Sequence, residues 1–389
     1  MNIKYNFDEI IDRRRSGSYK WDSEHGRDLI PLWVADMDFR AAPCITDALR
    51  RRVDHGVFGY THVGAGYYRA LRQWFAGRHG WDIRPSQVIY TPGVVPALSA
   101  IIKAFTSAGD GVIVMTPVYN CFFSSIRNNG CRVVESPLIQ EALDDRYFTY
   151  KIDFDSLEAL CADPANRMLL LCNPHNPAGR AWTREELQRV ADICRRHHVK
   201  VVSDEIHCEL VFNHAEYVPY GTVDPRAVVC VSPSKAFNTA GLQIANIVAP
   251  VRKEREAIDR AVNINEVCDV NPFGPVALEA AYSDKGAEWL SQLLDYLYAN
   301  YEVVRQAVAM QLPKCRVALL EATYLVWIDV SALGVPVDEL CRRMKDETGV
   351  WVNPGTMYGA EGFIRVNIAS PQALLSLAMV RMVEFLQKF

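Results

Sequence analysis

Residues 168–179 decide the fold; they read Met-Leu-Leu-Leu-Cys-Asn-Pro-His-Asn-Pro-Ala-Gly. The first five form a short apolar run closed by turn residues, which is typical of a strand buried on both faces. A helix follows, because Thr183 and Glu186 have the spacing of a capping box and precede apolar residues that share one helix face. A buried strand followed by a helix predicts a crossover connection in a parallel sheet.

The middle of the chain repeats this alternation of strand and helix. Short apolar runs predict further strands over residues 112–115, 132–135, 200–203 and 227–231, and a helical pattern covers 119–129. We therefore expect an α/β fold with a mostly parallel sheet whose two faces are covered by helices.

The last part of the chain has a different pattern. After about residue 271 a long helix runs on, and the strands over 323–330 and 363–368 alternate with helices over 337–348 and at the C-terminal end. This order is typical of a smaller α+β domain. We expect an N-terminal segment over 1–45 that is part of the small domain, a large domain over 46–280, and a C-terminal small domain over 281–389.

The composition excludes several classes of protein. Of the 389 residues, 50% are hydrophobic and 23% are charged, the balance of an ordinary globular chain. The net charge of −4 gives no reason to expect nucleic acid as a partner, and no apolar run approaches the roughly 18 residues that span a membrane. The N-terminal residues lack the layout of a signal peptide, and the 11 scattered cysteines contain no Cys-x-x-Cys. We expect a cytoplasmic protein with reduced thiols.

Three of the predicted strands are followed by residues that suit one cofactor. Asn173, Asp204 and Lys235 follow the strands over 168–172, 200–203 and 227–231, and 31 positions separate each from the next. Ligands of open α/β sheets bind at the carboxyl ends of the strands, so these side chains are expected to meet. Pyridoxal phosphate needs an amine for its aldehyde, a carboxylate that keeps its ring nitrogen protonated, and an amide for its ring oxygen.

Seven motifs carry a resemblance to a known family over nearly the whole chain. They are Trp33-Val-Ala-Asp-Met-Asp-Phe39, Phe58-Gly-Tyr-Thr61, Thr116-Pro-Val-Tyr119, Cys172-Asn-Pro-His-Asn-Pro-Ala-Gly179, Ser203-Asp-Glu-Ile-His207, Ser232-Pro-Ser-Lys-Ala-Phe-Asn238 and Phe363-Ile-Arg-Val-Asn367. The sequence resembles the fold-type I pyridoxal-phosphate superfamily of aspartate aminotransferase. Within it, the first and fifth motifs resemble the cystathionine β-lyase (C–S lyase) branch, the MalY/PatB family.

The resemblance implies catalytic roles for three residues. Lys235 would be the Schiff-base lysine and would carry the proton at the substrate Cα. Asp204 would pair with the ring nitrogen of pyridoxal phosphate, and Tyr119 would stack on the ring. Asn173 would hydrogen-bond the ring oxygen beside the substrate, with His207 close by.

The resemblance also implies contacts to the phosphate and to the substrate. The phosphate would be held by the helix N-terminus at Gly93, Val94 and Val95, by the hydroxyls of Ser232 and Ser234, and by Tyr60 of the neighbouring subunit in a homodimer. Arg365 would clamp the α-carboxylate of a small amino-acid substrate, and Ala35 would add a backbone contact to it.

Two positions depart from the aspartate aminotransferase pattern. Gln243 stands where that enzyme carries an arginine on the phosphate, and His207 stands where it carries a tyrosine on the ring oxygen. Both departures fit the lyase branch. They leave the phosphate with less opposing charge and put ring-oxygen contacts beyond Asn173 in doubt.

The resemblance implies a pyridoxal-phosphate C–S β-lyase that cleaves cystathionine or related cysteine S-conjugates to a thiol, pyruvate and ammonia. An aminotransferase is the alternative, since both reactions share the removal of the Cα proton. A non-catalytic regulator that keeps the fold is a further alternative. No metal-binding motif is evident, and we interpret the run Arg13–Arg15 as a solvated helix face.

Overall fold

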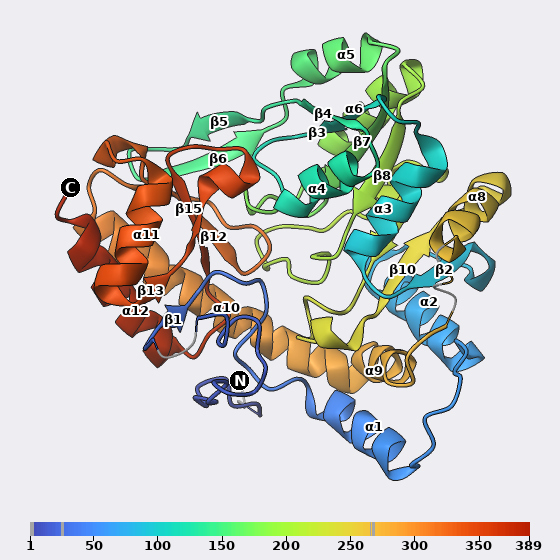
Figure 1. The fold of residues 1–389 in the computed structure, drawn as a ribbon, viewed down its shortest axis with the longest axis horizontal. Helices are drawn as coiled ribbons and strands as arrows, with labels where there is room; N and C mark the ends of the chain where they lie inside the picture. The colour runs from blue at the N-terminus through green and yellow to red at the C-terminus, as the bar shows by residue number, and fades with distance from the viewer. Residues whose placement is uncertain (1–3, 25–26, 265, 267–268) are drawn as a thin grey trace.

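The computed structural model describes residues 4–24, 27–264, 266 and 269–389. Its centre is a seven-stranded sheet with the strand order β2-β10-β9-β8-β7-β3-β4 (Figure 1). The strands are β2 (Val88–Thr91), β3 (Gly111–Val114), β4 (Arg132–Glu135), β7 (Asn166–Cys172), β8 (Lys200–Asp204), β9 (Val228–Val231) and β10 (Ala245–Val248). Only β10 runs antiparallel to its neighbours among these seven, so the prediction of a mostly parallel sheet is confirmed.

Successive residues of the central strands contribute to two separate cores, as the pleat of a strand requires. Met168 and Leu170 of β7 face a core built with α3 (Val94–Phe105), α4 (Asn120–Asn128) and α8 (Arg252–Asn263). Leu169 and Leu171 face the core on the other side, which includes α2 (Ala65–His79), α5 (Phe154–Ala162) and α6 (Arg184–Arg196). Helices therefore cover both faces, and α6 begins with the predicted capping box of Thr183 and Glu186.

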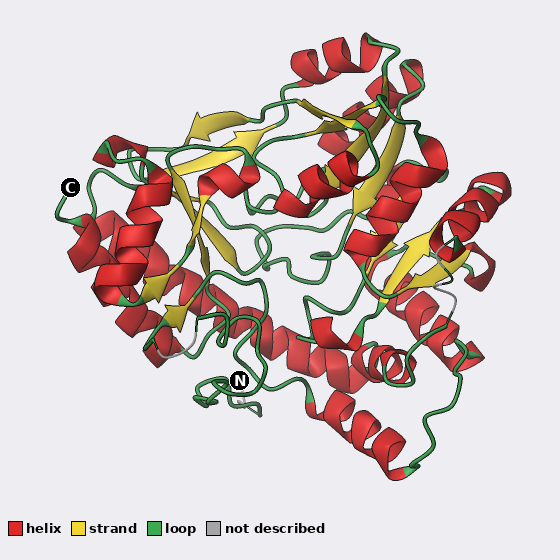
Figure 2. Cartoon of the chain, viewed as in Figure 1, coloured by secondary structure: helices red, strands yellow, loops and turns green. Residues whose placement is uncertain are grey.

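A second sheet of six strands lies toward the C-terminal half of the molecule (Figures 1 and 2). Its order is β14 (Asn353–Pro354), β15 (Phe363–Asn367), β12 (Leu325–Asp329), β11 (Arg316–Ala318), β6 (Tyr147–Lys151) and β5 (Ile139–Ala142). The strands β5 and β6 fall within the range predicted for the large domain, yet β6 pairs with the C-terminal strand β11 and β5 extends the sheet beyond β6. The exact domain boundaries stay a prediction.

The remaining helices frame the two sheets. They are α1 (Pro43–Asp54), α7 (Tyr220–Val223), α9 (Gly274–Ala281), α10 (Asp284–Gln311), α11 (Val337–Thr348) and α12 (Gln372–Leu386). The short strand β1 (Ile30–Pro31) pairs with β13 (Val350–Trp351), so the N-terminal segment joins the C-terminal elements. No helix within the described residues has both the length and the apolar character needed to cross a bilayer.

The interpretation of Arg13–Arg15 as a helix face is wrong, although Arg14 and Arg15 are exposed to solvent as expected. This stretch is irregular and then turns, because the Asp22 carboxylate accepts hydrogen bonds from the backbone N–H groups of Arg15, Gly17 and Ser18. The Arg13 guanidinium bends inward and pairs with the carboxylates of Asp36 and Asp38, each at 2.7 Å.

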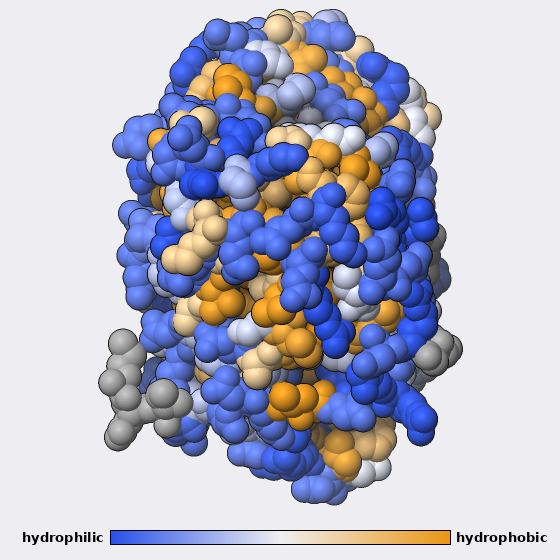
Figure 3. All heavy atoms as spheres, turned by 90° about the vertical axis from the view of Figure 1, so that its left-hand side faces the viewer, coloured by the Kyte–Doolittle hydropathy of each residue, from blue (hydrophilic) through white to orange (hydrophobic). Residues whose placement is uncertain are grey.

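The surface over the C-terminal elements is mixed. Figure 3 shows hydrophobic side chains in a central band that hydrophilic side chains break into small areas. Exposed apolar residues on these helices include Met310, Leu377 and Val380. Scattered exposure of this kind is ordinary for a globular protein and indicates no particular partner.

Candidate active site

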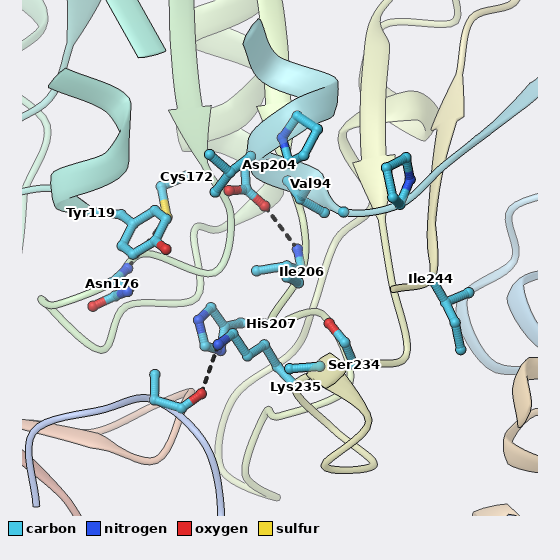
Figure 4. A pocket seen from close by; sticks show the side chains of 16 residues that line it. Val94, Tyr119, Cys172, Asn176, Asp204, Ile206, His207, Ser234, Lys235 and Ile244 are labelled. Carbon is cyan, nitrogen blue, oxygen red and sulfur yellow. Dashed lines mark hydrogen bonds between the residues drawn. The ribbon is translucent and has the colours of Figure 1, made fainter. Parts of the chain in front are cut away.

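A cavity of about 220 Å³ opens at the carboxyl ends of the central strands. Nine of the residues singled out in the sequence line it: Ala35, Gly93, Val94, Val95, Tyr119, Asp204, His207, Ser234 and Lys235. In Figure 4, Tyr119 and Asn176 lie on one side of the cavity, Ser234 and Ile244 on the other, and Asp204 and Lys235 at opposite ends. The sheet therefore brings together residues from five separate stretches of the sequence.

Lys235 lies in the turn that follows β9. Its Nζ donates a hydrogen bond to the Ala35 carbonyl at 2.6 Å (Figure 4). Burial lowers the pKa of Lys235 to about 8, and the nearby positive charge of Arg365 acts in the same direction. The neutral amine, which is the nucleophilic and basic form, is therefore accessible near physiological pH.

Asp204 ends β8 and is 3% exposed. The backbone N–H of Ile206 donates to Asp204 Oδ1 at 3.1 Å. Burial raises the pKa of Asp204 to about 7, and the neighbouring Glu205 carboxylate acts in the same direction; the hydrogen bond from Ile206 and the charge of Lys235 offset only part of the effect. A cationic group bound in the cavity beside this carboxylate would be strongly favoured.

The helix α3 points its N-terminus at the cavity. Gly93 precedes the helix, and Gly93, Val94 and Val95 all line the cavity. The first N–H groups of a helix have no acceptor within it, so they form a ready site for an anion. Ser234 adds a hydroxyl, and Ser232 supports it from behind with an Oγ–Oγ distance of 2.8 Å, although Ser232 itself does not line the cavity.

The two asparagines of the Asn-Pro-x-Asn-Pro motif differ in position, and the first is not where the sequence placed it. The Asn173 amide donates to Glu205 Oε1 at 3.1 Å and to the Val218 carbonyl at 3.0 Å, away from the cavity. Asn176 lines the cavity instead. The chain turns back after β7 and brings the second amide to the opening, so Asn176 rather than Asn173 is placed to contact a ligand in the cavity.

Arg365 lies in β15 at the edge of this region. Its guanidinium donates to Asn176 Oδ1 at 3.2 Å and to the Trp33 carbonyl at 3.0 Å, and it lies 4.5 Å from the ring centroid of Tyr358. Among the described residues no carboxylate pairs with it, and its buried Nε has no hydrogen-bond partner there. A buried guanidinium without a counter-charge is suited to receive a carboxylate from a ligand.

Tyr119 and His207 both line the cavity. Burial raises the pKa of Tyr119 well above its usual value, so the ring stays neutral. Burial lowers the pKa of His207 to about 3, and the charges of Lys235 and Arg365 add to the effect. His207 is therefore a neutral imidazole, and its buried Nδ1 finds no partner among the described residues.

Tyr60 and Gln243 lie outside the cavity of this chain. The Tyr60 side chain is 97% exposed. Gln243 adopts a left-handed backbone conformation with φ of 55°, and its carbonyl accepts a hydrogen bond from Tyr90 Oη at 2.6 Å. The structure thus gives Gln243 a role in fixing the loop after Lys235, and it leaves the contact proposed for Tyr60 untested.

Two further residues bond to the backbone of residues 35–39 beside the cavity. Tyr324 Oη donates to the Ala35 carbonyl at 2.9 Å, and Asn238 holds the backbone of Met37 and Phe39. Asn238 stands in the motif that also contains Lys235, so the motif marked its position but gave no signal of its contacts.

These residues fit pyridoxal phosphate in three independent respects. A buried carboxylate of raised pKa suits the cationic ring nitrogen, a free helix N-terminus with a serine suits the phosphate, and a lysine of lowered pKa suits the aldehyde. The unpartnered Nδ1 of His207 is a further polar atom in the wall that a bound molecule can satisfy.

The same arrangement has counterparts among known proteins. The sequence matches the family "Aminotransferase class I and II" over residues 27–380. The chain belongs to this family. Cystathionine beta-lyase PatB of Bacillus subtilis is 40% identical over 380 residues, which cover 95% of this chain and 97% of that protein.

Solved structures of this family agree over the full length. Cystalysin of Treponema denticola, whose structure contains a pyridoxal 5′-phosphate cofactor, superposes with a TM-score of 0.92 at 33% identity and covers 99% of each chain. The pyridoxal-phosphate-bound C–S lyase of Staphylococcus hominis gives a TM-score of 0.89 at 31% identity and covers 98% of this chain and 99% of that one. The expected fold-type I architecture of this aminotransferase-family chain is confirmed.

Proposed function

We propose that this aminotransferase-family protein is a pyridoxal-phosphate-dependent C–S β-lyase that acts on cystathionine or a related cysteine S-conjugate. The observation that carries the proposal is the meeting of Lys235 and Asp204 in one cavity, with the unpaired Arg365 at its edge. The relatives named as cystathionine β-lyase or C–S lyase match over nearly the whole chain, which supports this reaction class.

Each residue has a distinct task in this reaction. Arg365 binds the α-carboxylate and so fixes the orientation of the substrate, with Asn176 holding the guanidinium. Lys235 in its neutral form removes the Cα proton. Asp204 stabilises a positive charge on a group bound at the far side of the cavity. Tyr119 and His207 line the cavity as uncharged side chains.

Pyridoxal phosphate, when bound, supplies an electron-poor ring that accepts the electron pair left at Cα. The C–S bond then breaks and the sulfur leaves as a thiolate. The overall reaction consumes one water and yields a thiol, pyruvate and ammonia. Lys235 is the one amine lining the cavity among the described residues, so the same group is placed to carry the proton in both directions.

The decisive assay measures products without an added keto acid. The purified protein is incubated with cystathionine, and thiol and pyruvate are measured together. Equal amounts of both support the β-lyase. An aminotransferase needs a keto-acid acceptor and releases no thiol, so turnover only in the presence of an acceptor would replace the lyase by the alternative.

Lys235→Ala is the test variant for this assay, and Lys103→Ala is its control. Lys103 lies on the exposed side of α3, the helix whose N-terminus faces the cavity. Product formation should be lost in the first variant and kept in the second. A non-catalytic regulator would form no product in any of the three proteins.

We also propose that the working unit is a homodimer. Three apolar residues in the segment after α1 are exposed to solvent. They are Val57, Phe58 and Tyr60, with exposed fractions of 62%, 55% and 97%. Contiguous exposed apolar residues favour burial against a partner, and Tyr60 would then reach the phosphate of the neighbouring site.

A cytoplasmic location is part of the proposal. The ten cysteines within the described residues carry free thiols, and eight of these side chains are buried; Cys268 lies outside the described residues. Free thiols of this number suit a reducing compartment. The domain division into 1–45, 46–280 and 281–389 is kept as a proposal, with β5 and β6 as large-domain strands that extend the small-domain sheet.

A further inference from the structure

The residues 33–39, named here the crossing segment, have no regular secondary structure. Backbone carbonyls in a helix or strand bond to other backbone groups, whereas buried carbonyls elsewhere need other donors. Side chains supply them here. The Trp33 carbonyl accepts from Arg365 and Asn353, the Val34 carbonyl from Asn367, and the Ala35 carbonyl from Lys235 and Tyr324. The Asp36 carbonyl accepts from Asn367 and Lys20, the Met37 carbonyl from Arg13 and Asn238, and the Phe39 carbonyl from Asn238. The path of this segment is therefore fixed by its neighbours.

The donors come from two different parts of the molecule. Asn353, Arg365 and Asn367 belong to the C-terminal sheet, whereas Asn238 and Lys235 belong to the turn after β9. In Figure 1 the N-terminal part of the chain lies between these two parts. The crossing segment thus connects the C-terminal sheet to the turn that carries the catalytic amine.

Asn238 makes the connection on the side of the lysine. Its Oδ1 accepts from Met37 N–H at 3.0 Å, and its Nδ2 donates to the carbonyls of Met37 and Phe39, both at 3.0 Å. Asn238 has a φ of 54°, a left-handed conformation that asparagine adopts more readily than most residues. It lies three positions after Lys235, within a turn closed by the bond from Thr239 N–H to the Ser234 carbonyl.

The Ala35 carbonyl is the group that this arrangement brings to the lysine. Lys235 Nζ donates to it at 2.6 Å, and Tyr324 Oη donates to the same oxygen at 2.9 Å. A carbonyl binds an ammonium more strongly than a neutral amine, because the first hydrogen bond is charge-assisted. The charged or titratable groups that act on Lys235 are Arg365, Asp36, Asp204 and Cys121, and the neutral imidazole of His207 lines the same cavity.

We propose that Asn238 is a positioning residue that, through the backbone of the crossing segment, holds the Ala35 carbonyl against Lys235 Nζ as the acceptor for the ammonium formed in catalysis. In that step the substrate Cα–H bond breaks, its electron pair stays with the substrate, and the proton forms the third N–H bond on Nζ. The proposal rests on the proposed function only in taking Lys235 as the catalytic base.

The first test measures the pKa of Lys235 itself in the cofactor-free, full-length chain. Competitive labelling with acetic anhydride over a range of pH, followed by peptide mapping, gives this value without any turnover. Asn238→Gly removes all three hydrogen bonds and keeps the left-handed backbone accessible. We expect the Lys235 pKa to fall by about one unit, which corresponds to losing most of one charge-assisted hydrogen bond.

Asn271→Gly is the matched control. Asn271 also makes three side-chain hydrogen bonds, to the Leu242 carbonyl and from the N–H groups of Phe273 and Gly274, but none to the crossing segment. Its replacement should leave the Lys235 pKa unchanged. An equal shift in both variants, or none in Asn238→Gly, overturns the proposal.

Tyr324→Phe provides a test with the opposite sign and decides the question if Asn238→Gly does not fold. It removes the donor that competes with Lys235 for the Ala35 oxygen, so the Lys235 pKa should rise. An unchanged or lower value overturns the proposal.

The loaded enzyme adds a kinetic readout. Asn238→Gly should lower kcat while leaving KM for the substrate nearly unchanged, since Arg365 keeps its own contacts. Full activity of Lys235→Ala would refute the proposed function, whereas the labelling shifts would still report on the Ala35 contact alone, so the two failures are distinguishable.

Discussion

Replacing Asp204 by asparagine should make the cofactor-free protein more stable and the enzyme much slower. The carboxylate is buried with one backbone N–H as its hydrogen-bond donor, and its pKa is raised from 3.8 to about 7. A shift of about three pKa units means that folding disfavours the charged form of Asp204 by about 4 kcal/mol. Asparagine keeps the shape of the side chain and removes this cost.

The sign of the effect depends on pH. Because the folded-state pKa lies above the unfolded-state value, the folded chain holds the proton more tightly between pH 4 and 7, and stability falls as the pH rises through this range. The gain in the free energy of unfolding for Asp204→Asn should therefore be near zero at pH 4 and approach about 4 kcal/mol at pH 8 as an upper limit. Urea unfolding of the cofactor-free chain at both pH values measures it.

Catalysis should change in the opposite direction. Loss of a charge that stabilises the developing negative charge at Cα is worth about 3 kcal/mol or more, roughly a hundredfold in kcat. Asp295→Asn, an exposed position on α10, is the control for both measurements. A variant that is no more stable at pH 8 than the wild type, or that turns over at a near-normal rate, would refute this account of Asp204.

Three further outcomes are expected. Borohydride reduction of the holoenzyme followed by peptide mapping should label Lys235 alone, and a label on another lysine would contradict the assignment. Arg365→Ala should raise KM by about ten- to a hundredfold with a smaller change in kcat, because one charged contact to the substrate carboxylate is lost; an unchanged KM places the carboxylate elsewhere. Tyr60→Phe should weaken retention of the cofactor by about one to two decades, and co-expression with Lys235→Ala should restore one wild-type site per mixed dimer; no recovery, or an active monomer, argues against shared sites.

The sequence was informative where local pattern and strand order decide the structure. Asp204 and Lys235 were placed correctly at the cavity because Asp204 ends β8 and Lys235 lies in the turn after β9, and the first turn of α3 was recognisable from Gly93 and the apolar residues after it. Apolar runs also located five of the seven central strands to within about two residues, whereas β2 and β10 were not predicted. These features depend on a few neighbouring residues, so they can be read locally.

Other features depend on contacts between distant parts of the chain. Asn173 and Asn176 are equivalent in a motif, and only the turn after β7 decides which amide reaches the cavity. Strands β5 and β6 look like part of the preceding α/β pattern, although β6 pairs with β11, which lies more than 160 residues downstream. Arg13 looked solvated because the carboxylates of Asp36 and Asp38 are distant in sequence. Pairings of this kind carry no local signal.

The crossing segment also bears on which changes the chain can tolerate there. Its carbonyls, rather than its side chains, take most of the hydrogen bonds, so many substitutions would leave those bonds in place. Adding or deleting a single residue would instead offset each oxygen from its donor, from Trp33 at one end to Phe39 at the other. The number of residues in this stretch is therefore more tightly constrained than their identities. Loop grafts between homologous enzymes should conserve that number first.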